Sequence, residues 1–120
     1  MTETTNMTET TKITIKLSAD DLQLYRKKGN GTAARSLSTG ITRAIVEVIP
    51  MLGSAYDMDR NARAIGKVFD KHVRPRMNKH AHVGARDTEP RYVAAQTIIN
   101  YVKDHLGIPR NEWTTLGDWI

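Results

Sequence analysis

The segment from Lys12 to Leu17, KITIKL, constrains the fold more than any other part of the chain. Its polar and apolar residues alternate strictly, and successive side chains of a β-strand point to opposite faces, so the pattern predicts a half-buried strand. Everything downstream has the pattern of helices or loops. A strand without a partner leaves its backbone donors and acceptors unpaired. We therefore expect this strand to pair with its counterpart in a second copy of the molecule.

A first helix is predicted directly after the strand. Ser18 is placed to cap it, two carboxylates follow in the first turn, and the helix should run from about Ala19 to Lys28 with Leu22 on its inner side. The sequence Gly29-Asn30-Gly31 should end it.

A second helix should begin between Thr32 and Ser36 and end around Pro50 to Gly53. Its apolar residues recur at spacings of three and four, which marks one face of a helix. They are Leu37, Ile41, Ala44, Ile45, Val48, Ile49 and Leu52. Gly40 lies inside this helix, where glycine costs roughly 1 kcal/mol relative to alanine. We expect close packing at Gly40 to be the reason for it.

This order of elements resembles the ribbon-helix-helix family of DNA-binding proteins, to which the Arc and methionine repressors belong. The resemblance covers Lys12 to Leu52, and Arg35 to Ile45 looks like the second helix of the family. Ala94 to Trp113 is also similar to the closing helix and tail of the methionine repressor group. The residues that bind S-adenosylmethionine in that group are not found here, so no cofactor is expected.

The resemblance implies a mainly α fold with one N-terminal β-strand. Two chains would form a ribbon-helix-helix dimer through an intermolecular, two-stranded antiparallel ribbon, followed by a helical C-terminal extension. The dimer core would consist of Ile13, Ile15, Leu17, Leu22, Leu37, Ile41 and Ile45.

The same resemblance implies that the ribbon enters the major groove of double-stranded DNA. Lys12, Thr14 and Lys16 would then contact base edges. Phosphates would be contacted at the start of the second helix, where free amides and the helix dipole attract anions, by Arg35, Ser36 and Ser38. The chain would act as a transcriptional repressor in the cytoplasm, as a homodimer that could assemble further along DNA.

Composition is compatible with a polyanionic partner. Eighteen Lys and Arg against thirteen Asp and Glu give a formal net charge of +5. Cysteine is absent, which excludes disulfides and thiolate sites. No apolar run reaches the roughly 18 residues that a membrane span needs.

The chain divides into three regions: a disordered arm at residues 1–11, the ribbon-helix-helix region at 12–53, and the helical extension at 54–120. Within the extension, a third helix is predicted from Tyr56 to Val73, with Met58, Ala62, Ile65, Val68, Phe69 and Val73 on its apolar face. Pro75 and Gly84 predict a basic loop over about 74–87.

A fourth helix should begin at Thr88-Glu89-Pro90 and end at Gly107. Its predicted apolar stripe consists of Tyr92, Val93, Ala95, Ile98, Ile99, Val102 and Leu106. Trp113 and Trp119 then indicate a tail that docks on its own domain or on a second protein.

Catalysis and metal binding are not indicated. The sequence has no Walker-type loop, nucleophile elbow or HExxH motif, so we expect no enzyme. His80-x-His82 is a weak metal motif in a basic segment. The alternatives that remain open are a DNA-binding accessory protein for plasmid transfer or partition, an antitoxin whose C-terminal half binds a toxin, and a helical interaction module that the strand dimerises.

Overall fold

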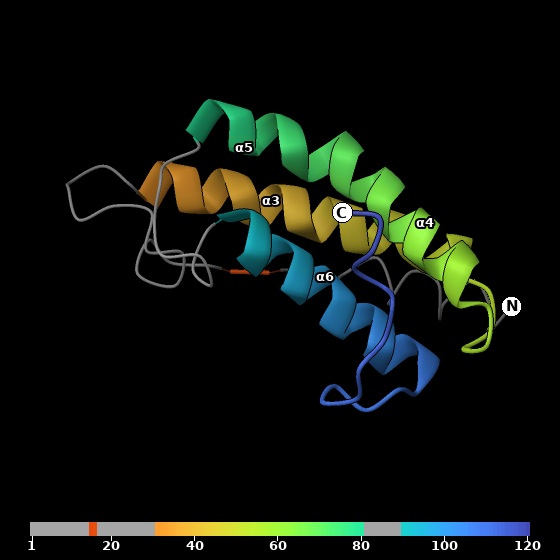
Figure 1. Ribbon diagram of the computed structural model, residues 1–120. Coiled ribbons are helices and arrows are strands. Elements are labelled where there is room, and N and C mark those ends of the chain that lie inside the picture. The colour runs from red at the N-terminus through yellow and green to blue at the C-terminus, as the bar shows by residue number, and fades with distance from the viewer. Residues whose placement is uncertain (1–14, 17–30, 81–89) are drawn as a thin grey trace, which may run out of the picture.

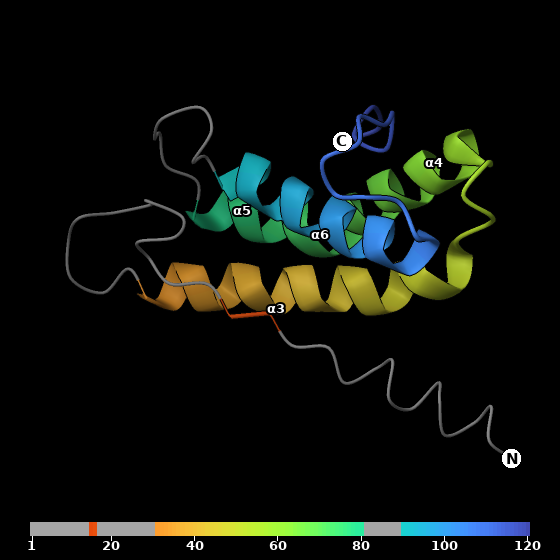
Figure 2. The ribbon, with the colours of Figure 1, turned by 90° about the horizontal axis from the view of Figure 1, so that it is seen from below.

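Helix α3, Gly31–Val48, is the element against which the rest of the molecule packs (Figure 1). The computed structural model describes residues 15–16, 31–80 and 90–120. Figure 2 shows α4, α5 and α6 on one side of α3, while Ile15 and Lys16 lie on another side. Ile15 and Lys16 thus lie on the side of α3 that is turned away from the other helices.

The remaining elements follow in chain order. A short 3₁₀ turn, η1 (Ile49–Met51), ends α3 and contains Pro50. Helix α4 (Met58–Val68) continues without interruption into a π-helical turn, η2 (Phe69–Val73), and then into α5 (Arg74–His80). Helix α6 is Pro90–Leu106, and residues 107–120 form an irregular tail. None of the helices described is long and apolar enough to cross a bilayer.

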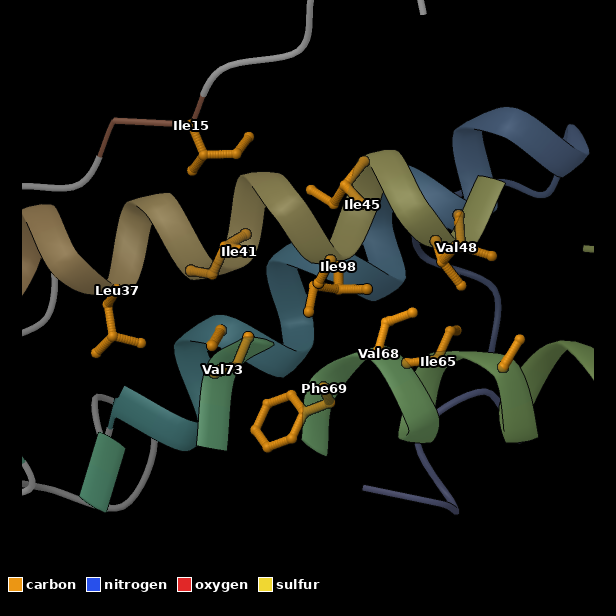
Figure 3. Close-up of a cluster of buried hydrophobic side chains, with 14 of the residues drawn as sticks. Ile15, Leu37, Ile41, Ile45, Val48, Ile65, Val68, Phe69, Val73 and Ile98 are labelled. Carbon is orange, nitrogen blue, oxygen red and sulfur yellow. The ribbon is translucent and has the colours of Figure 1, made fainter. Parts of the chain in front are cut away.

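The core lies where α3 meets α4, η2 and α6 (Figure 3). Residues three or four apart lie on the same side of a helix, so each of these elements contributes one apolar face. The fully buried side chains include Leu37, Ile41, Ile45 and Val48 of α3, Ile65, Val68, Phe69 and Val73 of α4 and η2, and Ala94, Ile98 and Val102 of α6. The apolar face predicted for the third helix is confirmed, with Met58 half-buried at its edge.

At Gly40, α3 lies directly against η2. A Cβ atom placed on Gly40 would lie 2.6 Å from the backbone oxygen of His72 and 2.8 Å from Cδ of Arg76. The close packing predicted at Gly40 is confirmed, because any side chain there would push the two helices apart.

The predicted ribbon-helix-helix fold is wrong. The described residues are mainly helical and include no strand. At the one described part of the predicted ribbon, the Ile15 side chain is buried, and its backbone N–H donates to Oγ1 of Thr42 of the same chain at 2.9 Å. A buried Ile15 next to an exposed Lys16 agrees with the predicted alternation. The same alternation is expected of a segment packed on a helix and of a strand in a ribbon, so it does not distinguish them.

The loop predicted from residue 74 is also wrong over its first part, because α5 extends to His80. The reason lies in η2, where the N–H of Arg74 bonds to the carbonyl of Phe69, five residues back. Pro75, which has no N–H to donate, directly follows this wider turn, where the regular bonding of the continuous helix is interrupted.

Helix α6 agrees with its predicted bounds. It begins at Pro90 and ends before Gly107, whose φ of 77° lies in the left-handed region that favours glycine at a helix end. The buried line is Ala94, Ile98 and Val102, whereas Tyr92 is half exposed.

The tail after α6 is fixed on its own domain, one of the two surfaces predicted for it, by buried aliphatic residues and by Trp119, which lies against Gly66 of α4. Leu116 and Ile108 are buried, while Trp113 is 80% exposed. The buried Lys103 donates from Nζ to the backbone oxygens of Arg110, at 3.1 Å, and Glu112, at 2.5 Å. Two backbone carbonyls of the tail are thereby satisfied by one side chain.

Candidate nucleic-acid interface

The structure describes four of the six residues predicted to contact DNA, namely Lys16, Arg35, Ser36 and Ser38. Lys12 and Thr14 lie outside the described residues, and Lys16 is exposed. Arg35 is exposed and Ser36 is half-buried. Ser38 is buried, and its hydroxyl donates to the carbonyl of Ala34 at 2.8 Å, so it faces away from any surface ligand.

Helix α3 also begins too early in the sequence for the predicted phosphate contacts at its first turn. Helix α3 begins at Gly31, so Ser36 and Ser38 lie beyond the first turn, where the backbone amides are already bonded within the helix. The backbone amides of Ser36 and Ser38 are therefore not free, and a phosphate contact at these positions would have to come from a side chain.

The predicted dimer core is buried within one chain. Ile15, Leu37, Ile41 and Ile45 belong to the cluster that α4, η2 and α6 complete. Ile13, Leu17 and Leu22 lie outside the described residues. No second chain is required to bury the four residues that the structure describes.

A surface that we call the α3 outer face collects the exposed polar residues of this helix together with Lys16. It consists of Lys16, Arg35, Thr39 and Arg43, all exposed. Arg35, Thr39 and Arg43 are four residues apart, which places them on one side of the helix and about 6 Å apart along its axis. Thr39 Oγ1 donates to the carbonyl of Arg35 at 3.1 Å. Thr42, next to Arg43, holds the backbone of Ile15 and thus brings Lys16 to the edge of this face.

Sequence reasoning identified Lys16 and Arg35 but missed Thr39 and Arg43. The signal was present, because continuing from Arg35 in steps of four reaches both of them, on the side opposite the apolar stripe. The expected helix start instead favoured Ser36 and Ser38 as the phosphate-contacting residues.

The cations of the α3 outer face have no acidic partner in the described part of the chain. The ion pairs found there join other residues: Arg63 to Asp59, Lys71 and His72 to Glu47, Arg74 to Asp70, and Arg110 to Asp104. Lys16, Arg35 and Arg43 therefore present uncompensated positive charge to solvent.

Glu47 is the one acidic residue within α3, and it is turned toward η2. Its carboxylate lies 2.7 Å from Nε2 of His72 and 3.1 Å from Nζ of Lys71. The hydrogen bond to His72 and then the bond to Lys71 lower the pKa of Glu47 below its ordinary value. Glu47 stays ionised, but its charge is matched by neighbours on η2 and does not offset Arg35 or Arg43.

A second basic surface runs along α4 and η2, and we call it the α4–η2 stripe: Arg60, Arg63, Lys67 and Lys71. Most of its members already have partners. Arg63 pairs with Asp59 at 2.7 Å and also lies 5.0 Å from the centre of the Trp119 ring. Arg60 donates from Nε to the carbonyl of Met51 at 3.2 Å. Among the described residues, neither Arg60 nor Lys67 has an acidic partner.

The α3 outer face has the residue types that contact nucleic acid. An arginine guanidinium can contact a phosphate, or the O6 and N7 acceptors of guanine, with two parallel hydrogen bonds. Threonine can bond to a base or touch a thymine methyl group. Arg35 and Arg43 are separated by about 12 Å along the axis of α3. The major groove is about 12 Å wide and admits an α-helix.

A metal site is not formed within the ranges that the structure describes, which contain no group of three histidine, aspartate or glutamate side chains placed to hold an ion. The His80-x-His82 motif lies outside the side chains described.

The chain matches no family model, no curated protein and no solved structure. Its function must therefore be argued from its own surface.

Proposed function

We propose that this protein is a regulator that binds double-stranded DNA through the α3 outer face, with α3 as the element that approaches the major groove. The observation that supports the proposal is that exposed Lys16, Arg35 and Arg43 gather on one face and have no acidic partner among the described residues, whereas Arg63, Lys71, Arg74 and Arg110 are ion-paired. Repression of transcription is the role that we favour for it.

Electrostatics supports a polyanion as the partner. The formal net charge is +5, and DNA carries one negative charge for about each 1.7 Å of duplex axis. Cations that already have a carboxylate partner gain less from a phosphate, because the existing ion pair must be broken first. Among the described residues, Arg35 and Arg43 have no such pair to break.

The packing of α3 supports a helix rather than a ribbon as the contacting element. Its inner side holds Leu37, Ile41 and Ile45 against three other elements, so the helix axis is fixed before any ligand arrives. A rigid support allows Arg35, Thr39 and Arg43 to be presented together without a folding step.

The test measures binding to a random-sequence duplex by fluorescence anisotropy over a series of salt concentrations. The double variant Arg35→Gln/Arg43→Gln removes two cations from the α3 outer face. If each contacts a phosphate, the slope of log K against log salt falls in magnitude by about 1.8, because each contact contributes about 0.9.

The matched control is Lys67→Gln/Arg91→Gln, which removes the same charge from two exposed positions outside this face. It should leave the slope close to that of the unchanged protein. Equal losses in the two double variants would contradict the assignment to α3, and no binding at low salt by the unchanged protein would contradict DNA binding altogether.

Sequence preference separates a repressor from an accessory protein. Selection from a pool of random duplexes should enrich a defined site for the unchanged protein, and Thr39→Ala should change the preferred base at one position. Binding without enrichment would favour the accessory role.

A further inference from the structure

A groove separates α6 from the C-terminal tail and is not part of the proposed DNA surface. Its wall on α6 comes from successive turns and includes Arg91, Tyr92, Ala95, Gln96 and Ile99, and the tail contributes Ile120 on the other side. The groove has a volume of about 340 Å³, which is near the lower end of the roughly 300–1,000 Å³ found for small-molecule sites.

Most of the groove is apolar. Tyr92 is 50% exposed and Ile99 and Ile120 are partly buried, so a ligand placed between them would cover apolar surface that now faces water. Gly117 lies next to this wall, because a Cβ atom on it would be 3.4 Å from Cδ1 of Ile99, an ordinary contact distance. Leu116 beside it is fully buried and anchors the tail, which forms the second wall.

The charge of the groove comes from Arg91. This side chain is exposed, and none of the ion pairs in the described part of the chain involves it. The other polar group, Gln96, already donates from Nε2 to Oδ1 of Asn100 at 3.0 Å. A guanidinium beside an apolar wall is complementary to a carboxylate attached to an apolar body, because a carboxylate accepts charge-assisted hydrogen bonds from it.

We propose that this groove binds a small carboxylate with an aromatic or branched apolar body. The body lies against Tyr92, Ile99 and Ile120, and the carboxylate contacts Arg91. The proposal is independent of DNA binding, because none of these residues belongs to the α3 outer face.

The natural tryptophans provide the measurement. Trp119 is next to Ile120 in the groove wall and is half exposed, whereas Trp113 is 80% exposed. The variant Trp113→Phe leaves Trp119 as the single tryptophan, and its fluorescence is followed during titration of the full chain with phenylacetate. Phenylacetamide, which has the same shape without the charge, is titrated in parallel.

Phenylacetate should give a saturable change with a dissociation constant of about 1 mM, the range for a ligand of about ten heavy atoms. Phenylacetamide should bind about tenfold more weakly, because it lacks the charge-assisted bond. Arg91→Gln should remove this difference. Ala95→Leu, which fills the floor of the groove, should weaken both ligands, and Arg43→Gln should change neither.

Chemical shifts of backbone amides locate the site without relying on fluorescence. Phenylacetate should shift the amides of Tyr92, Ala95 and Gly117 more than those of α4. The proposal is overturned if neither ligand saturates, if the acid and the amide bind equally, if Arg91→Gln retains the difference between them, or if the shifts centre elsewhere. None of these outcomes bears on DNA affinity, so this proposal and the proposed function fail separately.

Discussion

The α3 outer face and the α4–η2 stripe have similar charged residues but different surroundings. On the stripe, carboxylates or a backbone carbonyl contact Arg60, Arg63 and Lys71. On the α3 outer face, Arg35 and Arg43 have no acidic partner among the described residues. The stripe has four cations and the α3 outer face has three, so a count of charges alone would favour the stripe as the binding surface.

Whether the cations of a surface already have ion-pair partners therefore indicates more about its capacity to bind a ligand than the number of its charges does. A cation in an ion pair contributes to the fold or to solubility, and surface pairs contribute about 0–1 kcal/mol each. A cation kept without a partner is free to bind a ligand. The predictions that follow test two points. Side chains of the α3 outer face should contribute little to the free energy of unfolding, whereas ion pairs of the α4–η2 stripe should contribute to it.

The largest effect is expected from Gly40→Ala, on the packed side of α3. Alanine normally stabilises a helix interior relative to glycine, but here its Cβ would lie 2.6 Å from the His72 backbone oxygen. We expect a loss of about 1–3 kcal/mol in the free energy of unfolding, as for overpacked sites. Urea denaturation followed by circular dichroism measures it.

The control for Gly40→Ala is its neighbour Thr39→Ala, on the exposed side. It should change the free energy of unfolding by less than about 0.5 kcal/mol. A large loss at Thr39 would show that the outer face carries structure, and the contrast between the two surfaces would no longer hold.

A smaller effect is expected from Glu47→Gln, which removes the carboxylate partner of Lys71 and His72 on η2. The Glu47 side chain is 37% exposed, so solvent screens the pair, and we expect a loss of up to about 1 kcal/mol. The salt slope of DNA binding should stay unchanged. A steeper slope would show that the released Lys71 reaches a phosphate, which would give the stripe a role in binding.

The pH dependence of stability should reveal part of the same contribution. The hydrogen bonds from His72 and then Lys71 lower the pKa of Glu47 from its ordinary value of 4.5. The stabilisation is therefore fully present above pH 4.5 and is lost as pH falls through the lower pKa of the folded state. The difference in unfolding free energy between the unchanged protein and Glu47→Gln should shrink below pH 4.5, and a constant difference would rule out this origin.

The smallest effect is expected from Asp59→Asn, which releases Arg63 from an exposed pair four residues away on α4. The loss should be about 0.3–0.5 kcal/mol. Arg63 should remain over the Trp119 ring, so the tryptophan emission maximum should not move. A red shift would mean that Asp59 holds Arg63 on the ring.

Sequence reasoning succeeded where the cause is local. Helix α6 has proline at its start and glycine at its end, and both signals act within a few residues. The apolar faces of α3 and α4 followed from their spacing, and the unfavourable Gly40 correctly indicated close packing.

It failed where the cause is tertiary. The apolar stripe of α3 indicates that one side is covered but not whether another chain or α4, η2 and α6 cover it. The burial of Ile15 fits an intermolecular ribbon and a segment packed on α3 of the same chain equally well. The hydrogen bond to Thr42 of the same chain distinguishes the two. Spacing places Arg43 on the exposed side of α3, but its lack of an acidic partner among the described residues depends on tertiary packing, which spacing does not reveal.

The π-helical turn η2 explains how one long helical segment stays in contact with α3. Ile65, Phe69, Val73 and Met77 are all buried at a strict spacing of four. In a regular α-helix of 3.6 residues per turn, such a series drifts around the axis by about 40° per step, or about 120° from Ile65 to Met77. The turn at η2 accommodates extra residues and corrects part of this rotation. Deleting one residue from η2 would restore regular winding and swing Met77 away from α3, so this segment should tolerate substitution better than a change in length.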